Sequence, residues 1–208
     1  MGTSRPAFAW FMHHVFARLQ PAFLWQLRRE LTRRARGRVL EVGAGDGVNL
    51  ALYDPARVDH VFALEPDPAM RRYLLRAAVR APVPVAVLGG DAEHLPLADG
   101  TVDSLVYSLV LCTARQPAAA MAEARRVLRP GGRLLLLEHV VSEHPRWRRV
   151  QQAVNPVWSA VGGGCHLDRD TLATVRHQGF SLRLLRALPG ALTPLVLAEA
   201  TRSAPFTR

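Results

Sequence analysis

Runs of apolar residues alternate with helix-like segments along most of the chain. Short apolar runs predict five strands, over residues 38–42, 60–64, 83–88, 102–110 and 133–139. Apolar residues at helical spacing predict helices over 47–53, 68–80 and 117–128. Strands and helices that alternate in this way favour parallel strands with helices on both faces of the sheet.

The last quarter of the chain has a different pattern. A helix is predicted over 171–178, followed by strands over 180–188 and 195–200 that are joined through Pro189, Gly190 and Pro194. Such a short connection favours antiparallel pairing. We therefore expect an α/β fold with a Rossmann-like, seven-stranded mixed sheet, made of five parallel strands and a C-terminal antiparallel hairpin.

The segment before the first strand is amphipathic. Apolar residues recur at helical spacing over 5–36, Pro21 interrupts the pattern, and arginines such as Arg28 and Arg29 crowd its second half. This composition suits a lid or packing helix whose arginines are solvated, and it also suits a helix that rests on an anionic membrane surface. We therefore expect an N-terminal lid or membrane-contacting segment over 1–36 and one globular domain over 37–208.

The charge of the chain is strongly positive but has an unusual origin. The 208 residues carry a formal charge of +10, and every basic residue other than histidine is arginine, since the chain contains no lysine. The arginines are spread along the chain and are not interleaved with aromatic residues as in a strand-borne RNA-binding motif. We therefore do not expect a nucleic acid as partner.

Cysteine usage and hydropathy indicate the cellular setting. Cys112 and Cys165 are too few for a disulfide framework and lack the spacing of metal ligands, so no metal site is expected. The apolar start of the chain is interrupted by Arg18, Gln20 and Pro21, too early for a membrane span of about 20 residues. We expect a cytoplasmic protein, with peripheral membrane contact through 5–36 left open.

A glycine-rich turn follows the first predicted strand. Gly43, Gly45 and Gly47 alternate with other residues, and glycine permits backbone angles and close ligand approach that a side chain would prevent. This spacing differs from the Gly-x-Gly-x-x-Gly of dinucleotide-binding folds. Glu65, about 20 residues further on at the end of the second predicted strand, is placed to accept hydrogen bonds from ribose hydroxyls.

A third element strengthens the nucleotide interpretation. Asp91 and Ala92 follow the third predicted strand, where a carboxylate and backbone amides can hold an adenine ring. Together with the turn at Pro130 and Gly131 before the fifth strand, these elements resemble the class I S-adenosylmethionine-dependent methyltransferases. The resemblance implies S-adenosyl-L-methionine as cofactor and S-adenosyl-L-homocysteine as product. It implies that the cofactor is bound by Glu41, Gly43, Ala44, Gly45, Gly47, Glu65, Pro66, Asp91, Ala92, Ser108 and Leu109.

The second half carries a more specific resemblance. Residues 109–115, 138–140, Trp147, 151–152, 156–158 and 164–167 are similar to the membrane-associated alkyl-thiol S-methyltransferases of animals. The similarity spans roughly residues 38–200. The similarity does not include the N-terminal segment, where the animal proteins carry a longer hydrophobic anchor. The resemblance implies a small-molecule thiol as methyl acceptor.

A thiol acceptor makes modest chemical demands. The thiolate is the nucleophile, and a free thiol with a pKa of about 8.5 is already ionised to a few per cent at neutral pH. His139 ends the fifth predicted strand and is the catalytic candidate, to accept or orient the acceptor proton, although it could simply bond to a neighbouring carbonyl. The candidates for acceptor binding are Cys112, Trp147, Trp158 and His166; the tryptophans could equally be packing residues, and a buried Cys112 would be inert.

Two other functions fit the same residues. The fold hosts many acceptors, so transfer to a lipid or a quinone precursor is an alternative. A non-catalytic module that only binds the cofactor is another. The sequence leaves the oligomeric state open.

Overall fold

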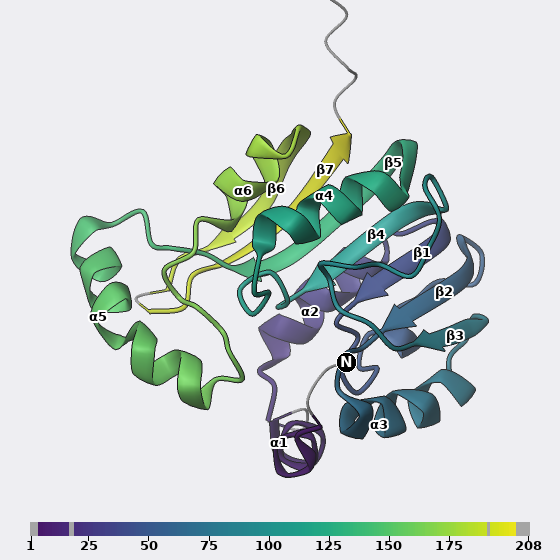
Figure 1. Cartoon of the computed structure of the whole chain (residues 1–208), viewed down its shortest axis with the longest axis horizontal. Helices are drawn as coiled ribbons and strands as arrows, with labels where there is room; N and C mark the ends of the chain where they lie inside the picture. Colours follow the sequence, from purple (N-terminus) through teal and green to yellow (C-terminus); the bar gives the residue numbers. More distant parts are fainter. Residues whose placement is uncertain (1–3, 17–18, 191, 203–208) are drawn as a thin grey trace, which may run out of the picture.

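Seven strands form one mixed sheet in the order β3-β2-β1-β4-β5-β7-β6 (Figure 1). The computed structural model describes residues 4–16, 19–190 and 192–202. The expected units 1–36 and 37–208 and the segment 5–36 therefore lie partly outside the described residues. The strands are β1 (Gly37–Val42), β2 (Val58–Leu64), β3 (Val85–Leu88), β4 (Val102–Ser108), β5 (Leu128–His139), β6 (Phe180–Leu188) and β7 (Leu195–Arg202). Strands β1 to β5 are parallel, and β7 runs antiparallel to both β5 and β6. The predicted fold is confirmed.

Helices cover both faces of this sheet. On one face α2 (Ala22–Thr32) and α3 (Pro68–Val79) bury leucines such as Leu27, Leu31 and Leu74 against the strands. On the other face α4 (Pro117–Val127) and α6 (Thr171–His177) contribute Met121 and Val175 to a second apolar layer. Parallel strands buried on both faces explain why their sequences are nearly continuous apolar runs.

The strand order reverses between β1 and β4. From β1 the chain moves outward through β2 and β3, then returns to place β4 and β5 on the other side of β1. The two connections therefore leave the sheet in opposite directions at the carboxyl ends of β1 and β4, which opens a crevice there. The glycine turn and the loop after β4 both begin at this crevice.

The N-terminal segment contains α1 (Pro6–Phe11), the π-helical turn η1 (Met12–Phe16) and α2. Pro21 is the residue that caps the start of α2, which confirms the predicted break. Leu24, Leu27 and Leu31 of α2 are buried in the core, so this helix belongs to the packed domain. None of the helices in the described ranges is long and apolar enough to cross a bilayer.

One predicted helix was wrong, and one helix of the structure was not predicted. The helix predicted over 47–53 is only the 3₁₀ turn η2 (Leu50–Leu52), because Gly47 has a φ of 86° and cannot start an α-helix there. The long helix α5 (Pro145–Val161) was not predicted. Its apolar residues Trp147, Val150, Val154 and Val157 recur at helical spacing, but Pro156 lies inside the helix and most of its side chains are exposed. In Figure 1, α5 stands away from the sheet.

Candidate functional site at the carboxyl edge of the sheet

The three glycines of the turn after β1 have different surroundings. All have positive φ, at 64° for Gly43, 60° for Gly45 and 86° for Gly47. A Cβ on Gly43 would lie 2.6 Å from Cγ2 of Val110, and one on Gly47 would lie 2.6 Å from Cβ of Ala77, so these two glycines allow close packing. A Cβ on Gly45 would meet nothing within 4 Å. Gly45 is thus the glycine with free space in front of it.

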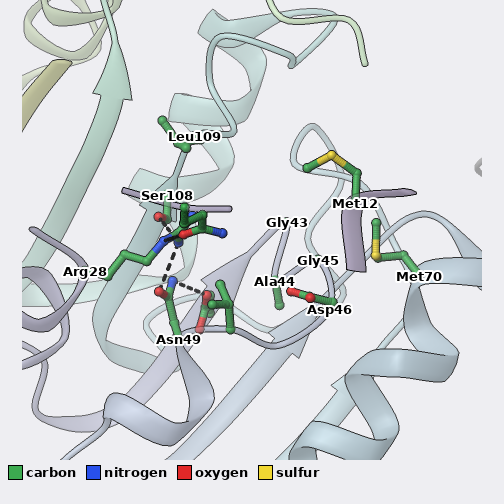
Figure 2. Close-up of a pocket in the computed structure, with 13 residues that line it drawn as sticks. Met12, Arg28, Gly43, Ala44, Gly45, Asp46, Asn49, Met70, Ser108 and Leu109 are labelled. Carbon is green, nitrogen blue, oxygen red and sulfur yellow. Dashed lines mark hydrogen bonds between the residues drawn. The ribbon is translucent and has the colours of Figure 1, made fainter. Parts of the chain in front are cut away.

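A cavity of about 150 Å³ lies beside this turn (Figure 2). Met12 from η1 and Met70 from α3 flank it, and the Leu109 loop closes the side next to β4. Leu109 has a φ of 62°, the only positive value among the non-glycine residues of the described ranges, and it ends β4 before the expected Val110. Backbone strain of this kind often occurs at functional sites. The lining residues are Met12, Gln20, Arg28, Glu41, Gly43, Ala44, Gly45, Asp46, Val48, Asn49, Met70, Ser108 and Leu109.

The cavity brings together about half of the cofactor residues expected from the sequence. Those that line it are Glu41, Gly43, Ala44, Gly45, Ser108 and Leu109. Those that do not are Gly47, Glu65, Pro66, Asp91 and Ala92. The assignment of these residues to a cofactor stays a prediction.

Glu65 nevertheless touches the turn directly. Its Oε2 accepts a hydrogen bond from the Gly45 N–H at 2.9 Å, and its Oε1 accepts one from the Asp67 N–H at 3.0 Å. The side chain is mostly buried, and burial raises its pKa above the ordinary value. Each carboxylate oxygen has a second lone pair, so both can still accept a hydroxyl.

Asp91 and Ala92 lie in different environments. Asp91 is partly exposed and forms ion pairs with His94 at 3.1 Å and Arg115 at 3.7 Å. Ala92 is buried in the apolar layer that faces α4. A ligand could therefore reach the Asp91 carboxylate but not the Ala92 methyl group in this structure.

Arg28 is a site residue that the sequence did not reveal. Its side chain is buried and reaches from α2 into the cavity, where Nη1 donates to Asn49 Oδ1 at 3.1 Å and to the Ser108 hydroxyl at 2.9 Å. Its Nε donates to Gln20 Oε1 at 3.1 Å. Burial lowers the pKa of the guanidinium from its ordinary value, although Glu41 opposes this shift. The expectation that the arginines of this segment are solvated or face a membrane is wrong for Arg28.

Glu41 completes the polar network behind the cavity. Its carboxylate accepts hydrogen bonds from the Asn49 amide at 2.7 Å and from the Tyr53 hydroxyl at 2.9 Å. Burial raises its pKa. Arg28, Asn49 and Glu41 are thus held in a fixed chain of hydrogen bonds, which presents a positive group to the cavity at low conformational cost.

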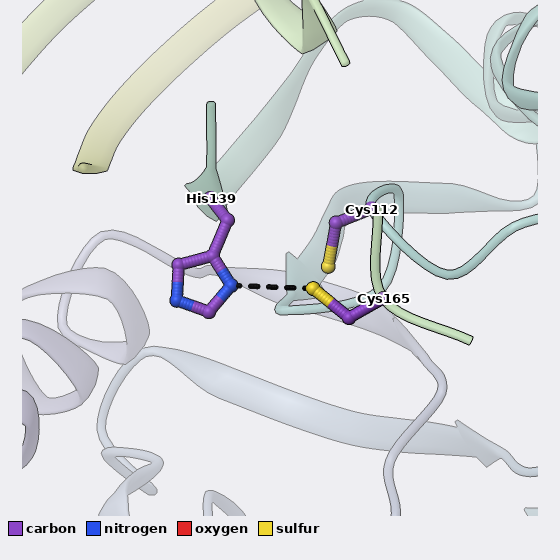
Figure 3. Close-up of side chains that lie close together, drawn as sticks. All are labelled: Cys112, His139 and Cys165. Carbon is purple, nitrogen blue, oxygen red and sulfur yellow. Dashed lines mark hydrogen bonds between the residues drawn. The ribbon is translucent and has the colours of Figure 1, made fainter. Parts of the chain in front are cut away.

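A second group of side chains lies along the same edge, beyond Leu109. Cys112, His139 and Cys165 meet there, with Cys165 Sγ 3.6 Å from His139 Nδ1 (Figure 3). The Cys112 thiol and the His139 imidazole lower the pKa of the Cys165 thiol well below its ordinary value. The pKa of Cys112 is raised by its hydrogen bond to Cys165 and by burial. The sequence separation of these residues concealed this group.

The other acceptor candidates lie around this group. Trp158 of α5 contributes to the lowered pKa of the Cys165 thiol, whereas Trp147 is an exposed residue near the start of the same helix. The His166 Nδ1 lies 3.1 Å from the Asn155 amide nitrogen. Trp158 therefore adjoins the Cys165 thiol, while the geometry gives Trp147 no such contact.

Glu138 holds the loop that carries Cys112. Its buried carboxylate accepts hydrogen bonds from the backbone N–H groups of Val110, Leu111 and Cys112, at 2.9, 3.0 and 3.4 Å. Burial raises its pKa to about 7. The sequence interpretation selected the neighbouring His139 and not Glu138. The signal that could have identified Glu138 is a charged residue inside an otherwise apolar strand.

Comparisons with known proteins identify relatives of this chain. Residues 40–136 match the family model described as methyltransferase domain. The human thiol S-methyltransferase TMT1B is 35% identical over 71% of this chain, and the human thiol S-methyltransferase TMT1A is 32% identical over 74%. This chain covers less than two thirds of these relatives, 62% and 64% of their lengths.

A solved structure supports the fold. The YcgJ protein from Bacillus subtilis superimposes with a TM-score of 0.73 at 17% identity, covering 87% of this chain and 98% of its own. The matched methyltransferase model spans β1 to β5, which includes the glycine turn, Glu65 and the Leu109 loop. Residues 40–136 therefore match a methyltransferase domain, and the chain is similar to the thiol S-methyltransferases.

Proposed function

We propose that this protein transfers the methyl group of S-adenosyl-L-methionine to a small thiol. The observation that carries the proposal is the continuity of two sites along one loop. Ser108 and Leu109 line the cavity beside the glycine turn, and Cys112, in the same loop, belongs to the group with His139 and Cys165. The names of the human relatives, thiol S-methyltransferases, support the same acceptor.

The residues around the cavity fit the cofactor. S-adenosyl-L-methionine, when bound, supplies a methyl group activated by a positively charged sulfur. Arg28 would bind the carboxylate of its methionine part, because a buried guanidinium pairs strongly with a carboxylate. The open space in front of Gly45 admits the ligand against bare backbone. Glu65 would bind the ribose hydroxyls, and Asp91 the adenine amino group.

The acceptor site needs alignment more than it needs a strong base. A thiolate is a good nucleophile, so holding its sulfur in line with the methyl group can supply several kcal/mol of barrier lowering. His139 and Trp158, both beside Cys165, would orient the acceptor. The N-terminal segment closes the cofactor side, since Met12, Gln20 and Arg28 all line the cavity.

Contact with a membrane surface is part of the same proposal. Large apolar side chains are exposed on the N-terminal segment, at Trp10, Phe11, Leu19 and Phe23, and on α5, at Trp147 and Val157. Arginines accompany both groups, which suits an anionic surface. A peripheral location would bring the enzyme to apolar thiols dissolved in lipid.

Turnover measurements test the proposed reaction. The purified protein is incubated with S-adenosyl-L-methionine carrying a labelled methyl group and with small alkyl thiols, phospholipid extracts or quinone precursors. We expect label in the thioether product. Label only in a lipid or quinone product would replace the thiol acceptor, and cofactor binding without any transfer would leave a binding module.

A further inference from the structure

The side chains of Cys112, His139 and Cys165 come from three distant segments. Cys112 lies in the loop after β4, His139 ends β5, and Cys165 follows the glycine run after α5 (Figure 3). The ligand atoms of all three lie within 4.8 Å of one another. Both cysteines are buried, whereas His139 is partly exposed, so the group is closed on one side and open on the other.

The distance between Cys165 and His139 matches that of a tetrahedral zinc centre, and the other two separations are no longer than 4.8 Å. With Zn–S bonds of about 2.3 Å and Zn–N bonds of about 2.0–2.1 Å, a sulfur and a nitrogen ligand lie about 3.6 Å apart and two sulfur ligands about 3.8 Å apart. Cys165 Sγ and His139 Nδ1 are 3.6 Å apart. The separations of Cys112 from His139 and from Cys165 are at most 4.8 Å, so zinc binding would shorten each by about 1 Å at most.

The chemistry of the group also favours zinc. Two thiolates and one imidazole are ligands of the kind that zinc prefers. Two thiolate charges balance the charge of the ion, which suits a largely buried site. Ligand groups that are already held in place lose little freedom when a metal binds.

The backbone around the ligands is indeed held in place. The Cys112 carbonyl accepts a hydrogen bond from the His166 N–H at 2.8 Å, which ties the two cysteine segments together. Arg169 Nη1 donates to the Leu111 carbonyl at 2.7 Å, and the Thr171 hydroxyl donates to the His139 carbonyl at 3.4 Å. These bonds fix the three segments that carry the ligands.

We propose that Cys112, His139 and Cys165 bind a zinc ion with one open coordination position, and that this position binds the acceptor thiol as a thiolate. Three protein ligands and one exchangeable position are the arrangement of catalytic zinc sites. The metal site stands on the geometry alone, whereas the identity of its ligand rests on the proposed function.

The reaction balances without an oxidant or reductant. A thiol that coordinates zinc loses its proton to solvent and displaces a water molecule. A lone pair of the resulting thiolate forms the new S–CH3 bond. The bond between the methyl group and the donor sulfur breaks, and its electron pair stays on that sulfur. His139 then acts as a metal ligand, in place of the proton acceptor suggested by the sequence.

Metal binding is tested on the full chain, reduced and freed of metal. The protein is titrated with Zn²⁺ against a chromophoric chelator and, in parallel, with Co²⁺, whose absorption reports tetrahedral geometry and thiolate ligands. We expect one ion per chain, with affinity lowered by 10-fold or more in Cys112→Ser, Cys165→Ser and His139→Gln. His177→Gln, an exposed histidine at the end of α6, is the matched control.

Two measurements on the unmodified chain test the site even where a variant does not fold. Zn²⁺ should slow the reaction of both thiols with a thiol reagent, and a small alkyl thiol should change the Co²⁺ spectrum. No stoichiometric metal, or a Cys112–Cys165 disulfide that forms in its place, would overturn the site. Metal binding with no spectral response to thiols would overturn the role of the open position. Labelled-methyl turnover reports separately on the proposed function.

Discussion

Nη1 of Arg28 donates a hydrogen bond to the Ser108 hydroxyl at 2.9 Å, which joins α2 to the end of β4 across 80 residues of sequence. The N-terminal segment thereby contributes a charged group to a cavity that also contains residues of the glycine turn, the end of β4 and α3. Arg28 therefore links ligand binding at this cavity to the packing of α2. Two ligands that differ in their carboxylate separate these two roles.

Arg28→Gln should weaken binding of S-adenosyl-L-homocysteine by roughly 10- to 100-fold, because a hydrogen bond to a charged group contributes about 1.5–3 kcal/mol. Methylthioadenosine has no carboxylate, so its affinity should change little. Calorimetry with both ligands measures the difference. Arg29→Gln, on the exposed side of α2, is the control. Equal losses for the two ligands would mean that Arg28 acts only through packing.

Glu65→Ala should weaken both S-adenosyl-L-homocysteine and methylthioadenosine by 10-fold or more, since both ligands carry the ribose whose hydroxyls Glu65 is proposed to bind. The same calorimetry applies, with the exposed Glu143→Ala as control. Unchanged affinity for either nucleoside would move the ribose site away from Glu65.

Gly45→Ala and Gly131→Ala form a matched pair. Both glycines have positive φ, 60° and 74°, and a Cβ on either meets nothing within 4 Å. Each substitution should therefore cost a similar amount of stability, about 1–2 kcal/mol. Only Gly45→Ala should also weaken cofactor binding, because its methyl group projects beside the cavity. Similar affinities in the two variants, measured by thermal shift with added cofactor, would argue against close approach at Gly45.

Glu138→Gln should destabilise the fold by about 1–3 kcal/mol, because an amide cannot accept hydrogen bonds from all three N–H groups of the loop without leaving a buried donor unpaired. Urea denaturation measures the change, and Glu143→Gln on an exposed position is its control. A loss no greater than the control's would show that the loop does not depend on this carboxylate.

Asp103 gives a pH-dependent prediction. Burial acts to raise its pKa, but hydrogen bonds from the Arg38 N–H and from Arg129 outweigh it and lower the pKa. A carboxyl with a lowered folded pKa stabilises the fold above its unfolded pKa of about 3.9, and this contribution is lost as pH falls through the folded value. Asp103→Asn should therefore melt lower than the unchanged chain at pH 7, and the difference should begin to shrink as the pH falls below about 4 and disappear below the folded pKa. Asp59→Asn, at an exposed position, is the control.

The sequence predicted the sheet well because its strands are buried on both faces and read as uninterrupted apolar runs. It placed Gly45 and Glu65 at neighbouring strand ends because glycine turns and acids at strand ends have fixed spacing in nucleotide-binding folds, and their hydrogen bond agrees with that placement. Their assignment to a cofactor stays a prediction. It missed Arg28 because a buried arginine on an arginine-rich helix has the same local pattern as its solvated neighbours. The group formed by Cys112, His139 and Cys165 depends on how three loops meet, which no local pattern encodes. Helix α5 was missed because Pro145 and Pro156 are turn signals in a sequence, although its apolar residues recur at helical spacing.

The position of β7 has a consequence for how the chain is made. β7 follows β6 in sequence but lies between β5 and β6 in the sheet. During synthesis on the ribosome, β6 therefore has no partner until β7 has emerged, and β5 meanwhile presents an open edge to other chains. A nascent chain that is interrupted before Leu195 should be prone to aggregation. This holds although β1 to β5, which position the glycine turn, are already complete.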